Sequence, residues 1–446
     1  VAFTLLVTLL VAVACSAIPA FRFGTAGLAT TLREGGRGGT AGRSRHRVRG
    51  ALVAAQIALA LVVLAGSGLL LRSFQRLHAV RPGWNADHLA TFWLSLPEAR
   101  YPRDTAVSLF YSRLATRVGE LPGVRAVGLA SRLPLTHRGE NTSPIWVEGD
   151  PSAAATLPPL QLFITTDGGF FHAMGVPLVA GRTFYALDGR QQSNEAIVNR
   201  VTAEHFWHDP SGANALGKRF QTLPNGPWFT VVGVVESVRD SSLEAAPAPT
   251  VYFPEVPPRD TTFNDLARTM GLVVRTAGDP AAITPQVEAV VHELDPSLPV
   301  YDVKPMTAVE RSSMARLSFT MLLIGVAAAV TLLLGAIGLY GVIAYVVSLR
   351  TRELGVRIAL GATPRAVARL VTRQGIVLTG VGIVAGLAVF ALVARFMRSL
   401  LFGVAPGDPL TLVAVSLVLV GIAALASWVP ARRAARVDPM EALRVE

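Results

Sequence analysis

Five apolar segments, each long enough to cross a bilayer, constrain the fold most strongly, since about 20 residues suffice for one span. They lie at residues 1–20, 51–71, 317–345, 375–394 and 410–429. Apolar residues make up 51% of the chain, which is high for a water-soluble protein. The sequence therefore predicts an α-helical membrane protein with five transmembrane spans.

The position of the basic residues predicts how these spans are oriented. Residues 73–316 hold 21 Lys and Arg against 24 Asp and Glu, so the net charge of +11 comes from elsewhere in the chain. The linker at 21–50, the stretch 349–374 and residues 431–446 together hold 17 Arg and 5 acidic residues. Basic flanks of this kind remain in the cytoplasm. This places residues 72–316 outside the cytoplasm, and 395–409 becomes a short outer loop. Nucleic-acid binding is disfavoured because no recognition motif accompanies the charge.

The large outer region has the periodicities of an α+β domain. Two strand–helix–strand units are predicted, at 88–96, 105–120 and 124–131, and again at 272–276, 281–294 and 298–303. Between them we expect an inserted subdomain, about 165–262, with strands at 195–199 and 229–235 and a short helix at 201–207. The expected fold class is thus a helical bundle of four plus one spans that carries a large α+β domain of two subdomains.

The most specific stretch is SLRTRELGVRIALGATPRAVARLVTRQG, within the cytoplasmic region 346–374 and ending at Gly375. Glu353 and Arg357 are four residues apart, with the acid first, which is the better order for a helical pair. Leu354 and Ile358 share one face of the same helix. The spacing predicts a short amphipathic helix directly after the third predicted membrane span.

This helix is predicted to stop and to be followed at once by another. Gly361 is a suitable helix stop, and Thr363 caps a helix that begins at Pro364. Such a basic hairpin is compatible with two functions. It either rests on lipid headgroups or serves as a docking helix for a cytosolic partner.

The two ends of the chain are versions of one segment. SAIPAFR at 16–22 recurs as SWVPARR at 427–433, and at the same offset Leu32–Arg33 falls on Leu443–Arg444. This repeat predicts a duplicated membrane protein. We expect residues 1–20 to be the last span of a first copy, with the rest of that copy upstream of Val1.

These motifs resemble one family. RTRELGVRIALGA at 350–362 and the tail PARRAAR-V-DPMEALR at 430–444 are similar to the coupling region and tail of FtsX-like and MacB-like ABC transporter permeases. The stretches at 174–184, 216–219 and 231–235 resemble the MacB-like periplasmic core domain of that family. The repeated ends resemble the duplicated "orphan" permeases, of which this chain looks like the C-terminal half plus one span.

The resemblance implies a function and a set of partners. A separate cytosolic ATPase dimer would grip the coupling helix, and its ATP-driven motion would reach the periplasmic domain during export of a substrate or lipoprotein. The implied ATPase-coupling residues are Arg350, Arg352, Glu353, Leu354, Arg357, Ile358 and Gly361. The family also implies the bacterial inner membrane, a homodimer or a pseudo-dimer with the other repeat, and a periplasmic adaptor. An FtsX-like regulator that signals to a cell-wall hydrolase without transport is the alternative.

No catalytic, metal or cofactor site is predicted. GANALGKR at 212–219 nearly matches a phosphate-binding loop, but Arg219 replaces the Ser or Thr that would bind Mg²⁺. His205 and His208 have no third ligand nearby, and Cys15 is the only cysteine. We therefore expect no ATPase activity from the chain itself, and a membrane-anchored enzyme is disfavoured.

Two features of the spans leave alternatives open. Gly382 and Gly386 form a G-x-x-x-G pattern that permits close helix packing, either within one subunit or at a dimer seam. Gln56 is an isolated polar residue in the second span. A hydrogen bond to a neighbouring helix is the simpler explanation for it, and a transport path is the other.

Overall fold

The computed structural model describes residues 41–78, 80–136, 138, 141–149, 157–185, 191–259, 266–350, 353, 356–358, 360, 362–398, 401 and 403–434. The chain divides into two compact units. The membrane unit comprises the described residues of 41–66, 327–395 and 409–434. The outer unit comprises those of 67–326 and 396–408.

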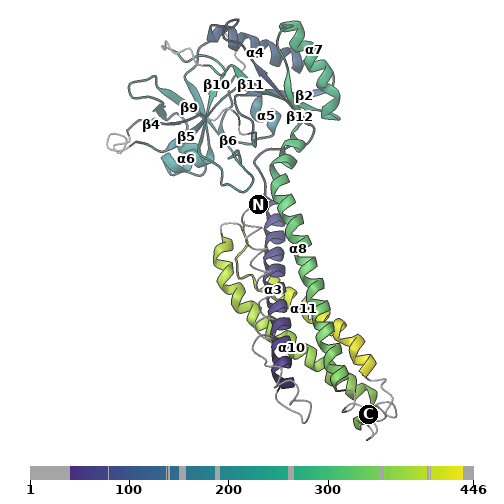
Figure 1. Ribbon diagram of the computed structural model, residues 1–446. Helices are drawn as coiled ribbons and strands as arrows, with labels where there is room; N and C mark the ends of the chain where they lie inside the picture. The colour runs from purple at the N-terminus through teal and green to yellow at the C-terminus, as the bar shows by residue number, and fades with distance from the viewer. Residues whose placement is uncertain are drawn as a thin grey trace. The chain divides into compact units, whose positions relative to one another are not determined.

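Four long apolar helices correspond to the last four predicted spans (Figure 1). They are α3 (Ala41–His78), α8 (Met306–Leu349), α10 (Pro364–Met397) and α11 (Pro409–Ala434). Their stretches able to cross a membrane are Gly50–Leu77, Ser318–Leu349, Pro364–Met397 and Pro409–Arg433. The last four predicted spans thus fall on helices that are long and apolar enough to cross a membrane. The span predicted at 1–20 lies outside the described residues, as do most of the predicted linker and the part of the tail motif after residue 434.

Two of these helices are longer than a bilayer requires. Helix α8 has 44 residues and α3 has 38, so α8 is about 66 Å long at 1.5 Å per residue. The hydrocarbon core of a membrane is about 30 Å thick. Both helices continue from one unit into the other.

Glycines bring α10 close to its neighbours in the membrane unit. A Cβ at Gly382 would lie 2.7 Å from the Cβ of Ile57, and one at Gly386 would lie 3.0 Å from the Cα of Ala58. Both contacts are with α3 of the same chain. The G-x-x-x-G pattern therefore packs within one subunit, which is the first of the two alternatives.

The side chain of Gln56 lies against another glycine of the bundle. A Cβ at Gly338 in α8 would lie 2.3 Å from Gln56 Oε1. The amide of Gln56 therefore occupies the space that the absent side chain of Gly338 leaves on the neighbouring helix.

The outer unit is built on one twelve-stranded mixed sheet of two halves. The first half has the order β12–β1–β11–β2, all antiparallel. These strands are β1 (Leu89–Ser95), β2 (Val124–Ala130), β11 (Thr269–Thr276) and β12 (Tyr301–Pro305). Helices α4 (Asp104–Gly119) and α7 (Thr284–Leu294) pack side by side over this half (Figure 1). Both predicted strand–helix–strand units are therefore confirmed.

The second half of the sheet has the order β5–β10–β7–β9–β8–β4, with β3 on β5 and β6 on β9. Its strands are β3 (Thr142–Pro144), β4 (Trp146–Val147), β5 (Leu160–Thr166), β6 (Leu178–Gly181), β7 (Glu195–Asn199), β8 (Arg219–Gln221), β9 (Phe229–Val235) and β10 (Thr250–Pro254). Helix α6 (Arg200–Trp207) packs on this half, whereas α5 (Phe170–Met174) packs against β2 and β11 of the first half. Strands β3, β4 and most of β5 precede position 165, so this half begins before the expected start of the insertion.

The first half of the sheet has apolar cores on both faces. Side chains alternate along a strand, and β1 sends Leu89 and Trp93 into one core and Phe92 and Leu94 into the other. Six of its seven residues are buried. The first core also contains Leu77 of α3 and Met306 and Val309 of α8. The outer-unit ends of both long helices are therefore anchored in the core under the sheet.

Candidate functional site

The predicted coupling pair is present beyond the end of α8. Arg357 Nη2 lies 2.6 Å from Glu353 Oε1, one helical turn away. Both side chains remain about half exposed, at 49% and 48%. An exposed pair of this kind contributes only about 0.3–0.5 kcal/mol to stability. Both charged groups therefore remain accessible to a partner.

The other predicted coupling residues are described only in part. Arg350 is exposed immediately after α8, and its backbone N–H bonds the carbonyl of Val346 at 3.2 Å. Ile358 is half-buried. Arg352, Leu354 and Gly361 lie outside the described residues.

A tight turn connects this segment to α10. Leu360 donates its N–H to the carbonyl of Val356 at 3.0 Å, while its own side chain is 83% exposed. The N–H of Ala366 lies 3.4 Å from Thr363 Oγ1, and α10 starts at Pro364. The predicted cap and helix start are confirmed. The turn presents a large apolar side chain to its surroundings.

The first turns of α10 carry a row of positive charge. Arg365, Arg369 and Arg373 are exposed and four residues apart, so they share one face of the helix. Leu370 beside them is 41% exposed. The coupling region thus combines exposed apolar side chains with exposed charges, which suits either a lipid headgroup layer or a protein partner.

A second feature of interest is the seam between the two halves of the outer sheet. Strands β2 and β5 are in register at one position, where Ala130 faces Thr166. Beside it, the carboxylate of Asp167 replaces a further strand contact: its Oδ1 accepts from the N–H of Leu129 at 2.9 Å. The Asp167 N–H in turn donates to the Leu129 carbonyl at 3.1 Å. The two halves are therefore joined by a short stretch of backbone and by hydrogen bonds that involve the side chains of Asp167, Ser131 and Thr166.

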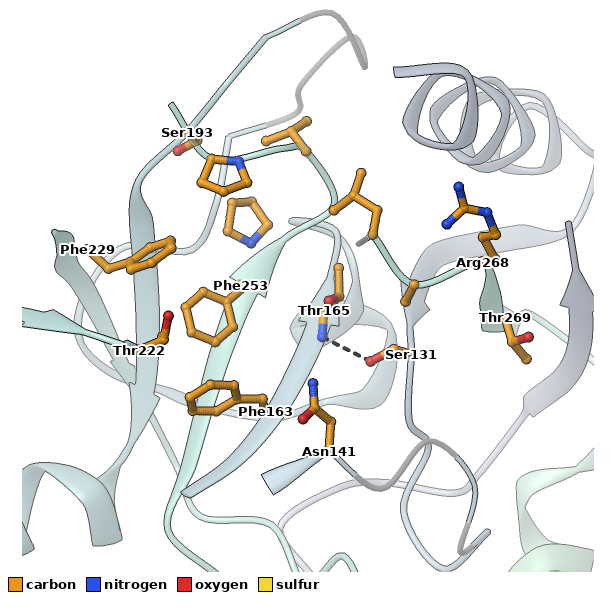
Figure 2. A pocket seen from close by; sticks show the side chains of 15 residues that line it. Ser131, Asn141, Phe163, Thr165, Ser193, Thr222, Phe229, Phe253, Arg268 and Thr269 are labelled. Atoms are coloured by element: carbon orange, nitrogen blue, oxygen red, sulfur yellow. Dashed lines mark hydrogen bonds between the residues drawn. The ribbon is translucent and has the colours of Figure 1, made fainter. Parts of the chain in front are cut away.

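A cavity of about 550 Å³ opens at this seam, and Figure 2 shows the aromatic side chains that line one side of it. Phe163 of β5, Phe229 of β9 and Phe253 of β10 converge there. The ring centroids of Phe163 and Phe253 are 5.0 Å apart, as are those of Phe229 and Phe253, and both pairs meet edge to face. Rings in this arrangement form a rigid apolar wall.

The other side of this cavity is polar. Ser131 Oγ accepts from the N–H of Thr165 at 3.0 Å, and Asn141, Arg268 and Thr269 lie beside them (Figure 2). The Nε of Arg268 is buried without a hydrogen-bond partner among the described residues. The cavity has the size and the mixed lining of ligand pockets, which run from about 300 to 1,000 Å³.

The near-match to a phosphate-binding loop is a structural turn. Gly212 adopts φ 75°, a short 3-10 helix spans Ala213–Ala215, and Gly217 again has φ 75°. Arg219 then begins β8 and pairs with Glu148. The segment follows α6 and not a buried strand, so the geometry of a nucleotide-binding loop is not formed here.

Two family models match the chain in succession. The MacB-like periplasmic core domain matches residues 52–293, and the FtsX-like permease C-terminal domain matches residues 325–439. The chain belongs to the FtsX-like and MacB-like ABC transporter permeases. The resemblance seen in the coupling and tail motifs is thereby confirmed.

Several relatives carry names that fit this family. The chain is 27% identical over 284 residues to the pyoverdine export ATP-binding/permease protein PvdT of Pseudomonas fluorescens, covering 63% of this chain and 42% of that protein. It is 26% identical to the macrolide export ATP-binding/permease protein MacB of Marinobacter nauticus, covering 60% of this chain and 41% of that protein. It is 24% identical to the ABC transporter permease YknZ of Bacillus subtilis, covering 62% of this chain and 68% of that protein. The chain thus spans less than half the length of the PvdT and MacB proteins.

Among solved structures, the periplasmic region of MacB from Actinobacillus actinomycetemcomitans aligns at 13% identity and a TM-score of 0.34, covering 52% of this chain and 94% of that one. A TM-score this low carries no argument about the fold. The family match and the four apolar helices make the permease a multi-pass inner-membrane protein, with its mixed α/β outer unit in the periplasm.

Sequence patterns missed the residues of the seam. Asp167 directly follows β5, a strand that was not predicted. In the sequence alone, the stretch Thr166–Asp167–Gly168–Gly169 indicates only a turn. A Cβ on Gly168 would lie 2.3 Å from the carbonyl oxygen of Phe184. This close approach is a tertiary contact for which a single sequence contains no local signal.

Proposed function

We propose that the permease transmits ATP-driven motion from a cytosolic ATPase to its periplasmic outer unit, and that this motion drives export. The observation that supports this most is the succession of the two family matches along one chain, at 52–293 and 325–439. Relatives named for export of pyoverdine and of macrolides are similar to this chain over 63% and 60% of its length.

The anchoring of α8 supports mechanical transmission. The helix starts at Met306, directly after β12 ends at Pro305, and runs without interruption to Leu349 next to the coupling region. Met306 is fully buried in the outer core, and Trp84 Nε1 donates to Glu310 Oε1 at 3.0 Å. A continuous helix fixed in a packed core passes a displacement of one end to the other.

In this proposal a separate ATPase dimer supplies the energy and holds the segment 350–362. Glu353, Arg357 and the exposed Leu360 would contact it, together with Arg350, Arg352, Leu354, Ile358 and Gly361. The relatives' names combine ATP binding with permease function. Two copies of the membrane unit, either identical subunits or the two repeats of a duplicated chain, would match the two-fold symmetry of such a dimer.

The decisive experiment distinguishes two roles of the Glu353–Arg357 pair: contact with the ATPase, and stabilisation of its own helix. The full chain is purified from its native host as wild type, as Glu353→Arg, as Arg357→Glu and as the double swap. The ATPase that accompanies it is identified and quantified by mass spectrometry. The double swap restores the intrahelical pair but reverses both charges toward a partner.

We expect all three variants to lose an ATPase that the wild type retains. Glu244→Arg, an exposed change in the outer unit, is the matched control and should leave the amount unchanged. Recovery of the ATPase by the double swap would mean that the pair only stabilises the helix. Absence of any ATPase with the wild type would overturn the proposal.

A further inference from the structure

A second cavity of the outer unit lies near the same seam and has a different chemical character. Its volume is about 330 Å³, within the range of sites for small molecules. It lies where the parallel strands β5 and β10 end. Helix α4 contributes Ser108 and Thr116 to its wall, and Asp167 and Glu255 line it from the ends of the strands. Tyr185, with 65% of its surface exposed, marks where the cavity reaches solvent.

Glu255 is the unusual residue of this cavity. Its side chain is only 7% exposed, and both carboxyl oxygens are buried without a hydrogen-bond partner among the described residues. Its backbone is well held: the N–H donates to Thr166 O at 3.1 Å, and the carbonyl accepts from Ser108 Oγ. Buried polar groups in folded proteins are almost always paired, so an unpaired carboxyl that lines a cavity is available to bind a ligand.

The charge around Glu255 defines what kind of ligand fits. Burial raises the pKa of Glu255 well above its usual value, and the neighbouring carboxylates of Asp167 and Asp104 raise it further. The described residues that line the cavity include no Lys, Arg or His. Burial thus favours the neutral form of Glu255, and its ionised form would have no positively charged partner in the described lining, so a cation is complementary to it.

The size of the cavity and its lining favour an organic cation over a metal ion. Among the described residues, no three His, Cys, Asp or Glu side chains gather closely enough to hold a metal. The space is about ten times the volume of one water molecule. Buried Phe184 offers apolar surface to an alkyl group, whereas the ring of Tyr185 already stacks with the guanidinium of Arg182, 4.0 Å from the ring centroid.

We propose that this cavity binds a small organic cation whose ammonium group pairs with the carboxylate of Glu255. On binding, the neutral carboxyl of Glu255 gives its proton to the solvent, and the resulting carboxylate accepts hydrogen bonds from the ammonium. The site spans the seam, because Ser108 and Thr116 belong to the first half of the outer unit and Glu255 follows β10 in the second. This inference goes beyond the coupling function and does not depend on an ATPase partner.

The first test measures thermal unfolding of the full chain in detergent, followed by tryptophan fluorescence. n-Butylammonium chloride is the probe, with n-butanol and sodium butyrate as neutral and anionic probes of the same chain length, all at equal ionic strength. A ligand well above its Kd should raise the Tm by about 2–4 °C. We expect this shift with n-butylammonium alone.

The variant Glu255→Gln keeps the shape of the side chain and removes its charge, so it should lose the shift. The matched control, Glu244→Gln at an exposed position, should keep it. An equal shift with n-butanol, retention of the shift by Glu255→Gln, or stabilisation by CaCl₂ without stabilisation by the amine would each overturn the proposal.

A second measurement needs no variant. Calorimetric titration of the wild type with n-butylammonium in two buffers of different ionisation enthalpy reports the protons released on binding. We expect about one proton per bound cation, because a buried carboxyl must ionise to form the pair. Binding without proton release would contradict the role given to Glu255, whatever the behaviour of the variants.

Discussion

Trp84 Nε1 donates a hydrogen bond of 3.0 Å to Glu310 Oε1, which ties the first turns of α8 to a loop of the periplasmic outer unit. The indole is only 6% exposed, and burial raises the pKa of Glu310. The bond lies beside Met306 and Val309, the α8 residues that enter the outer core. It therefore reinforces the attachment of the start of α8 to the outer core.

This bond makes a prediction for position 310. Glu310→Leu leaves the buried indole N–H without its acceptor, so we expect a loss of about 1–3 kcal/mol in stability. Glu310→Gln keeps the acceptor oxygen and should lose much less. Denaturant unfolding of the two purified variants measures the difference, and equal losses would show that the hydrogen bond is not responsible.

Breaking the buried ion pair of Arg132 and Asp240 should lower the stability of the protein more than breaking an exposed ion pair. Their side chains are 1% and 5% exposed. Asp240→Ala leaves a buried guanidinium without its charged partner, which costs about 3–5 kcal/mol. The control is Glu148→Ala, which breaks the exposed pair with Arg219 and should cost at most about 1 kcal/mol. Similar Tm changes in the two variants would contradict the expectation that breaking the buried pair costs more stability than breaking the exposed pair.

Stability should depend on pH through Asp167. Burial outweighs the backbone N–H groups that bond this carboxyl and raises its pKa from 3.8 to about 7. Between these values the folded protein holds a proton that the unfolded chain has released. Stability therefore falls as pH rises from about 4 to about 7, by up to about 1.4 kcal/mol per pH unit for this one group.

Asp167→Asn removes this titration and should make the same part of the stability curve less steep, while Glu255, whose pKa burial also raises, keeps part of the slope. Unfolding midpoints measured at a series of pH values give both curves. The exposed variant Glu244→Gln should follow the wild type. A curve for Asp167→Asn as steep as that of the wild type would place the titrating group elsewhere.

Close packing of α3 against α10 should tolerate no added side chain at Gly382. A Cβ there would lie 2.9 Å from the carbonyl oxygen of Ala54, a backbone atom that cannot move aside cheaply. We expect Gly382→Ala to lower the Tm in detergent, typically by the equivalent of about 1–3 kcal/mol. Gly380→Ala is the matched control on the same helix, since nothing lies within 4 Å of its added Cβ. A lower Tm for both variants would mean that replacing glycine in α10 is destabilising in itself, and not that the contact with Ala54 is responsible.

The membrane helices and the first half of the outer sheet follow from local sequence patterns. The spans are long apolar runs, β1 is a short apolar run, and the buried residues of α4 recur at helical spacing. The cap at Thr363 and the pair Glu353–Arg357 were predictable because both depend on residues within four positions. Such features need no knowledge of the rest of the chain.

The second half of the sheet and its cavities were not predictable in this way. Strand β5 pairs with β10 in parallel across some 90 residues, as Leu162 faces Thr250. Glu255 looks like an ordinary exposed acid in the sequence, and only the fold buries it. Its isolation results from three segments meeting at the seam, and a single sequence carries no signal for that meeting.

Helix α8 contains no proline between Met306 and Leu349 and has no break in its 44 residues. One residue inserted into such a helix turns everything beyond it by about 100° and shifts it by 1.5 Å. Among homologues, insertions and deletions should therefore be rare within α8 and should gather in loops. If α8 transmits motion as proposed, its length should be conserved among homologues more strictly than its composition.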